Sequence, residues 1–227
     1  MAGAIDLNFT DHFPITSVTF SIEKEGGNFF YDEYAVTDPT TGASYGTVWA
    51  NHYFSGYNPL NPYNWAAKYT FLDTEGNEQM RLVKNYGLLN FDLDALTAAF
   101  WGIFSNSAAK SSDFFAYNSR RESAGYIDGR LIGLGTRFDI ADSKGHYIAN
   151  IRIPKNKEVA NIYRESGDGK IGAIKANDET LEIGDVKVNV QKGTCDDRIL
   201  ALLSAHLLRY NLLDLSPGRH MQIHSKA

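Results

Sequence analysis

The sequence contains little cysteine and little proline, and it has no long cluster of basic residues. Cys195 is the single cysteine among 227 residues, which excludes an intrachain disulfide and is typical of a reducing compartment. With 22 basic and 27 acidic residues the net charge is −5, so no overall positive field attracts nucleic acid. We therefore expect an intracellular protein, cytoplasmic or peripheral on a membrane, with no nucleic-acid partner.

The N-terminal stretch "MAGAIDLNFTDHF" also lacks the basic start and apolar core of a secretory signal. The most apolar segment, 196–215, is interrupted by Ser204, His206 and Arg209, and a charge at that place is unfavourable in lipid. We expect no transmembrane span. The predicted organisation is an N-terminal arm over 1–12, a single domain over 13–215, and a flexible tail over 216–227.

The usual marks of a metal or catalytic centre are missing as well. None of the six histidines forms a pair with metalloprotease spacing, and the acidic pairs do not follow the register of a calcium loop. The stretch G-A-S-Y-G at 42–46 fits the G-x-S-x-G pattern of serine hydrolases. However, a strand pattern follows Ser44 where a nucleophile elbow requires a helix. We expect no metal, no cofactor and no catalytic residue, and the sequence favours a non-enzymatic protein.

What the sequence does contain is a repeated hairpin signal. Three segments each join two alternating apolar runs through an Asp followed three or four residues later by a Gly: 34–48, 69–83 and 138–153. The Asp can accept backbone N–H bonds in a turn, and the Gly supplies a positive φ. These turn residues are Asp38 and Gly42, Asp73 and Gly76, and Asp142 and Gly145. With further strand patterns over 13–25, 123–137, 160–176 and 179–193, the sequence predicts about ten to twelve antiparallel strands.

Two segments follow a helical pattern instead. The first predicts a helix near 91–105. The second predicts a helix over 197–213, capped by Asp196 or Asp197, whose leucines point all round its axis. Such a helix is buried on every side, and its length of about 25 Å matches that of an eight-residue strand. The predicted fold is therefore mainly β, a barrel of about twelve strands that encloses the C-terminal helix.

These segments resemble a known superfamily. "YAVTDPTTGASYGTV", "YTFLDTEGNEQMRLVKN" and "DDRILALLSAHLLRY" are similar to the hairpins and terminal helix of the tubby C-terminal-like superfamily, which includes LURP-one-related proteins and phospholipid scramblases. The resemblance covers most of residues 13–213. It implies a twelve-stranded barrel around the helix and a binding module that acts at phosphoinositide-containing membranes or as a protein-interaction adaptor.

Basic residues are the candidate ligands for phosphate head groups that this resemblance implies. They lie in "NSRRES" and "IRIPKNKE", and they are Arg120, Arg121, Arg152, Lys155 and Lys157. Clustered Lys and Arg suit phosphates, but no stretch reaches the about four to eight basic residues of a lipid-recognition cluster. A solvated face of an acidic protein explains the same residues.

An aromatic loop at 52–65 is the second candidate surface. It contains Tyr53, Phe54, Tyr57, Tyr63 and Trp65 among Gly, Asn and Pro residues. Loops of this composition make good contact surfaces, but the same aromatics could instead plug a barrel mouth. Two other functions stay open: an enzyme or small-ligand carrier with a pocket at that mouth, and a structural subunit that assembles through the helix near 91–105. The oligomeric state cannot be predicted.

Overall fold

A computed structural model describes the chain in ten stretches, which contain twelve strands and one helix. The described residues are 17–27, 31–51, 68–84, 113–132, 135–154, 159–164, 169–176, 186–191, 196–210 and 212–213. The strands are β1 (Ser17–Gly27), β2 (Tyr31–Thr37), β3 (Ser44–Asn51), β4 (Lys68–Leu72), β5 (Glu78–Lys84), β6 (Phe114–Asn118), β7 (Ser123–Ile132), β8 (Gly135–Asp142), β9 (Tyr147–Ile153), β10 (Val159–Arg164), β11 (Lys170–Ala176) and β12 (Val186–Gln191). The helix is α4 (Asp197–Arg209).

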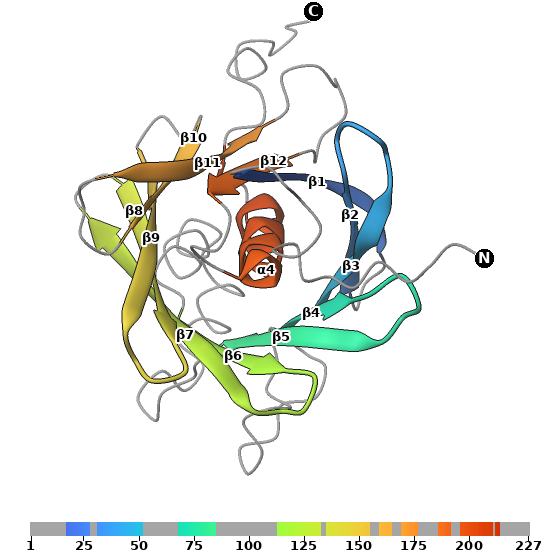
Figure 1. The fold of residues 1–227 in the computed structure, drawn as a ribbon, viewed down its shortest axis with the longest axis horizontal. Helices are drawn as coiled ribbons and strands as arrows, with labels where there is room; N and C mark the ends of the chain where they lie inside the picture. Colours follow the sequence, from blue (N-terminus) through green and yellow to red (C-terminus); the bar gives the residue numbers. More distant parts are fainter. Residues whose placement is uncertain are drawn as a thin grey trace, which may run out of the picture.

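The strands form one closed antiparallel barrel (Figure 1). Each strand pairs with its neighbours in sequence, and β1 pairs with β12 in the register Ser17↔Gln191 to Ile22↔Val186. The prediction of a mainly β barrel with about twelve strands is thus confirmed. Because closure gives every strand two partners, the sheet has no free edge.

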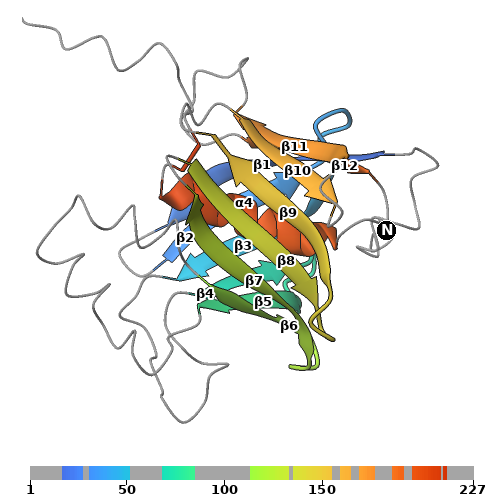
Figure 2. The ribbon, with the colours of Figure 1, turned by 90° about the vertical axis from the view of Figure 1, so that its left-hand side faces the viewer.

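The core lies between the inner barrel wall and α4, which occupies the centre of the barrel (Figure 1) and runs behind β7–β9 in the side view (Figure 2). Alternate strand residues point inward, such as Phe71 of β4 and Phe138 of β8, and both are fully buried. Every residue of α4 from Ile199 to Leu208 is also buried. The predicted all-round apolarity of this helix therefore matches its place in the barrel.

The two ends of the barrel differ in their connections. At one end, which we name the turn end, short hairpin turns join β2 to β3, β4 to β5, β6 to β7 and β8 to β9, and α4 begins there. At the other, the loop end, the chain leaves β3 before residues 52–67 and leaves β5 before residues 85–112. The helix ends at the loop end, where Arg209 Nη1 donates to the carbonyl oxygens of Ala50 and Asn51 at 3.1 and 2.8 Å.

The turns at Asp38, Asp73 and Asp142 share one hydrogen-bond plan. Asp73 Oδ1 accepts the backbone N–H groups of Glu75 and Asn77 at 2.9 and 2.8 Å, and Asp142 Oδ1 accepts those of Lys144 and His146 at 2.8 and 2.9 Å. Asp38 Oδ1 likewise accepts from Thr40 and Thr41. The glycines Gly42, Gly76 and Gly145 have φ values of 71°, 84° and 84°, which L-residues rarely adopt. Ser44, just after the first turn, begins β3 and so lies on a strand.

A fourth turn, between β6 and β7, follows this plan without the signature residues. Asn118 Oδ1 accepts the N–H groups of Arg120 and Glu122, both at 3.0 Å. Arg121 holds the position that glycine takes in the Asp73 and Asp142 turns, with φ of 64°. An Asn therefore replaces Asp as the acceptor, and an arginine adopts the left-handed conformation.

The helix is shorter than the predicted 197–213, which is a correction of its C-terminal end. α4 ends at Arg209, where the N–H of the cap residue Tyr210 donates to His206 O. The N–H of Leu212 donates to Leu207 O at 2.8 Å, a bond that closes a helix by spanning five residues. Leu212 and Leu213 nevertheless stay buried, so the apolar pattern continued past the helix. The helix predicted near 91–105 lies outside the described residues.

Polar residues within the core have partners that explain their burial. His206 Nδ1 lies 2.9 Å from Tyr69 Oη, and the rings of Tyr69, Phe114, Phe138 and Tyr210 surround the imidazole. Ser204 Oγ donates to Leu200 O at 2.7 Å. His206 is therefore a buried core residue whose polar atom has a partner. In the described part of the chain, no helix is both long and apolar enough to cross a bilayer.

Candidate functional site

Three arginines form a row across the outer face of β7, β8 and β9. The strand register pairs Arg130 with Arg137 and Arg137 with Arg152. Directly opposite residues of an antiparallel pair have Cβ atoms roughly 5 Å apart, and like charges at such positions are destabilising. We name these three residues the arginine row. The electrostatic repulsion among their charges requires compensation from nearby groups.

The repulsion among the arginines is compensated by the carboxylates of Asp128 and Asp139, which lie opposite each other on the same outer face. Arg130 donates to Asp128 through Nε at 2.7 Å and through Nη2. Arg137 Nε donates to Asp139 Oδ1 at 2.6 Å, and Arg130 Nε lies 3.9 Å from Asp139 Oδ2. Each of these acids is two residues away from its arginine on the same strand, so β-sheet alternation places both on one face. The hydrogen bond to Asp128 raises the pKa of Arg130.

Arg152 has no carboxylate partner among the described residues. Its Nε donates to the amide oxygen of Asn150 at 2.8 Å, and its guanidinium lies 4.6 Å from the ring centre of Tyr163. Arg152 thus contacts two neutral groups, whereas Arg130 and Arg137 each pair with a carboxylate. The arginine row therefore keeps an uncompensated positive charge and unused guanidinium donors.

A small surface pocket lies beside the arginine row. Its volume is about 240 Å³, and its lining residues are Arg130, Arg137, Asp139, Tyr147, Ala149 and Asn150. Asp139 and Asn150 are almost fully buried, whereas the side chain of Arg130 is 54% exposed. The pocket is smaller than the roughly 300–1,000 Å³ of drug-sized ligand sites. Its size suits a compact polar group such as a phosphate, which the exposed guanidiniums would meet first.

The charges around the barrel are distributed unevenly. The described residues of β7–β11 and their turns carry seven Lys and Arg against three Asp. Those of β1–β3 carry five Asp and Glu against one Lys. These two sides face each other across α4 (Figure 1). The molecule thus has a basic side that includes the arginine row, although its net charge is negative.

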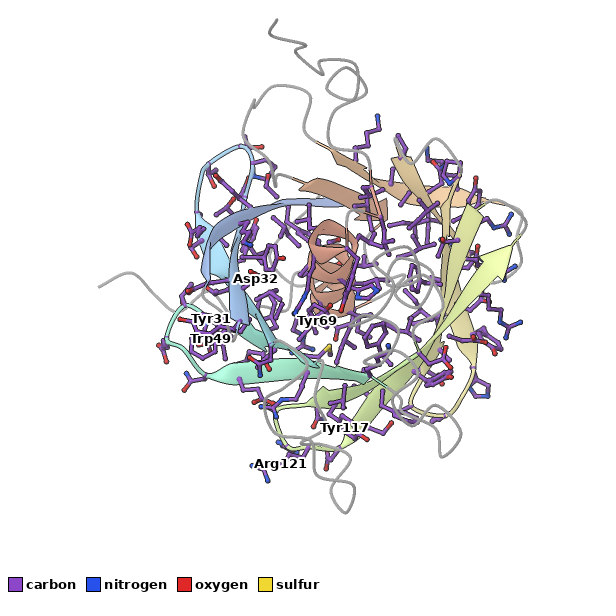
Figure 3. All side chains as sticks on the ribbon, turned by 180° about the vertical axis from the view of Figure 1, so that it is seen from behind. Tyr31, Asp32, Trp49, Tyr69, Tyr117 and Arg121 are labelled. Carbon is purple, nitrogen blue, oxygen red and sulfur yellow. The ribbon has the colours of Figure 1, made fainter. Side chains whose placement is uncertain are left out.

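The structure separates the basic residues that the sequence singled out. Arg152 lies in the arginine row near the loop end. Arg120 and Arg121 lie in the β6–β7 turn at the turn end, and Figure 3 shows Arg121 at the outer edge of the barrel. The seven residue steps from 123 to 130 along β7 span about 23 Å, so these two arginines do not join the row. Lys155 and Lys157 lie outside the described residues, as do Tyr53, Phe54, Tyr57, Tyr63 and Trp65 of the predicted loop surface.

Sequence reasoning missed Arg130 and Arg137 because neither belongs to a basic cluster in the chain. A signal was present in the hairpins themselves. If the turn after Ile132 is centred on residues 133–134, Arg130 falls opposite Arg137. The Asp142–Gly145 turn in the same way brings Arg152 near Arg137, with a bulge between Ile140 and Ala141. Counting the strand register through these two successive hairpins would have predicted that the three arginines lie side by side.

Comparison with known proteins leaves the fold to be defined by this chain's own strand pairings. No protein-family model and no curated protein matches the sequence. Among solved structures, the chain is similar to an X-ray structure of a protein from Arabidopsis thaliana, at 12% identity and a TM-score of 0.48. That similarity covers 85% of this chain and 90% of the other. The strand pairings themselves define a closed antiparallel barrel with a central helix.

Proposed function

We propose that this protein is a non-enzymatic binding module that docks on anionic phospholipid surfaces through the arginine row. The observation that carries the proposal is the presence of three directly opposed arginines with only two carboxylates to balance them. Each Lys or Arg near an anionic bilayer contributes about 1 kcal/mol of attraction. The sequence resemblance to the tubby C-terminal-like superfamily supports the same class of function.

The filled interior favours binding on the outer surface. Inward residues of the wall and the apolar residues of α4 from Ile199 to Leu208 form one packed cluster, and both Phe71 and Leu202 are fully buried. A ligand inside the barrel would have to displace this core. In the described part of the chain, no three His, Cys, Asp or Glu residues gather as metal ligands. The exposed guanidinium of Arg130 is a group that a ligand can reach from outside the barrel.

Vesicle flotation tests this proposal. The native chain should float with vesicles that contain phosphatidylserine or a phosphoinositide and stay behind with phosphatidylcholine vesicles. Replacing Arg130, Arg137 and Arg152 together by Gln should weaken binding by about fivefold per arginine, from the attraction that each one supplies. Binding should also fall as salt rises, since screening weakens exposed charges.

A matched control removes the same amount of positive charge from the turn end. Arg120, Lys144 and Lys170 are exposed there, and their replacement by Gln should leave flotation nearly unchanged. Equal losses in the two triple variants would show a non-specific effect of net charge and contradict the proposal. Absence of flotation by the native chain with any anionic vesicle at physiological salt would also contradict it.

A further inference from the structure

A stacked pair of aromatic residues, one half-buried and one exposed, lies on the opposite side of the barrel from the arginine row. Tyr31 at the start of β2 and Trp49 near the end of β3 stack with ring centres 5.4 Å apart and an interplanar angle of 25°. Figure 3 shows both rings on the outer side of the wall, away from α4. Trp49 is 40% exposed, and Tyr147 is the other large apolar side chain that is exposed among the described residues. Stacking on Tyr31 therefore fixes the orientation of the Trp49 ring, whose face lies on the outer surface.

A carboxylate stands directly beside this face. The register pairs Glu33 of β2 with Trp49 of β3, so the two Cβ atoms lie roughly 5 Å apart on the outer surface. On its other side Glu33 faces Gly26 of β1, where a Cβ would lie 3.9 Å from Glu33 Oε2. Because glycine has no side chain, Gly26 leaves the space beside the Glu33 carboxylate open.

The side of Trp49 that faces β2 and β1 is acidic, whereas on the other side the register leads through Thr70 to Arg81, which is paired with Glu78. Glu25 on β1 is exposed, and the lysine of this side, Lys24, is taken by Asp32 at 2.7 Å. An anionic bilayer would be repelled by this side, which distinguishes it from the arginine row. An aromatic face beside carboxylates is instead complementary to a cation. Arginine is the best match, because its planar guanidinium stacks on aromatic rings and pairs with carboxylates at the same time.

We propose that the outer face of β2 and β3, formed by Tyr31, Trp49 and Glu33, is a docking surface for an arginine-bearing segment of a protein partner. The guanidinium stacks on the Trp49 ring and donates hydrogen bonds to the Glu33 carboxylate, while Glu25 adds longer-range attraction. This proposal is independent of the membrane role of the arginine row. If both hold, the barrel binds an anionic surface on one side and a basic protein segment on the other, which is the arrangement of an adaptor.

Fluorescence polarisation of labelled peptides, without vesicles, tests the docking surface. The probe is a peptide of alternating arginine and glycine, compared with the matching lysine and glutamate peptides. The native chain should bind the arginine peptide best, the lysine peptide less and the glutamate peptide not at all. Trp49→Ser should weaken the arginine peptide by about 5- to 30-fold, in keeping with a desolvated cation–π contact. Glu33→Gln should weaken it by about 3- to 10-fold through loss of charge alone.

Matched controls keep each outcome decisive. Tyr147→Ser removes the other exposed aromatic and Glu122→Gln removes a turn-end carboxylate, and neither should change peptide binding. Because Glu33→Gln changes only charge, it tests the site even if Trp49→Ser fails to fold. Native-like binding by both Trp49→Ser and Glu33→Gln would overturn the proposal.

Two further outcomes separate this proposal from the membrane role. The triple Gln variant of the arginine row should bind the arginine peptide normally, so that failure of flotation leaves this result intact. Light scattering distinguishes a second copy of this chain from a separate partner. Self-association that disappears in both Glu33→Gln and the arginine-row variant would show that the row of another copy occupies the surface, and it would overturn the assignment of a separate protein partner.

Discussion

At the residue scale, Arg121 occupies a backbone conformation that suits glycine. Its φ of 64° is the one positive value among the described residues other than glycine, and it lies in the same turn position as Gly76 and Gly145. A left-handed conformation costs an L-residue roughly 1–2 kcal/mol. Arg121 therefore holds local strain that the other turns avoid.

Replacing this arginine by glycine should stabilise the protein. Arg121→Gly relieves the left-handed conformation but increases the freedom of the unfolded chain, so we expect a net gain of about 0.5–1 kcal/mol in the free energy of unfolding. Urea denaturation followed by circular dichroism measures the change. Arg120→Gly, whose φ carries no such strain, should be neutral or destabilising, and a gain from this control as large as that from Arg121→Gly would contradict the explanation.

At the scale of the element, the start of α4 contains a buried acid. Asp196 caps the helix, with its Oδ1 accepting the N–H of Arg198 at 2.9 Å. Asp197 follows in the first turn and is only 6% exposed. Burial, with a smaller contribution from the charge of Asp196, raises the pKa of Asp197 from 3.8 to about 7. The helix thus begins with one carboxyl group that caps and one that resists ionisation.

This raised pKa predicts how stability changes with pH. A folded-state pKa above the unfolded value means that the folded protein holds the proton more tightly, so stability is present below about pH 4 and declines as pH rises to about 7. Asp197→Asn removes this dependence. Relative to the native protein, the variant should gain roughly 2–4 kcal/mol between pH 4 and pH 8. Urea unfolding at the two pH values measures the gain, and parallel pH profiles would refute the assigned burial effect.

The same elements show which features could be read from the sequence and why. The Asp–Gly turns and their strands are local signals, because acceptor, glycine and alternation all lie within about fifteen residues. The end of α4 was misplaced because Leu212 and Leu213 continue the apolar pattern although the chain has left the helix. The β6–β7 turn lacked its signal because Asn118 and Arg121 stand where the other turns have Asp and Gly.

The arginine row and the Trp49 surface could not be read in the same way. Both depend on which residues of neighbouring strands lie opposite each other, so a shift of one residue would move either set to the other face of the sheet. Of the predicted phosphate ligands that the structure describes, which are Arg120, Arg121 and Arg152, only Arg152 lies in the row. Arg120 and Arg121, adjacent to strand β7 in sequence, lie at the far end of the barrel.

At the scale of the whole molecule, the barrel depends on α4 for its core. The inward faces of the strands, including Phe20, Val48 and Ile162, pack around a helix that is itself fully buried over most of its length. Without the helix, this apolar surface would surround a void or collapse. We therefore expect the barrel to be stably folded only when its central helix is in place.

Removal of α4 tests this dependence. A chain that ends before Asp196 should lose cooperative unfolding and bind a hydrophobic dye, because large apolar areas no longer leave water. A control chain that ends after residue 215 keeps the helix and lacks only the predicted flexible tail, and it should unfold cooperatively. Cooperative unfolding of the shorter chain, followed by near-ultraviolet circular dichroism, would show that the strands alone form a stable barrel.

The pairing of β1 with β12 has a consequence for how the protein is made. The ribosome synthesises β1 more than 150 residues before its partner β12. The helix α4 is synthesised after β12. During that interval the nascent chain has unpaired strand edges and an unfilled interior, the features that recruit chaperones and promote aggregation. We therefore expect the barrel to complete its folding only late in synthesis, once the ribosome has made the helix around which the strands close.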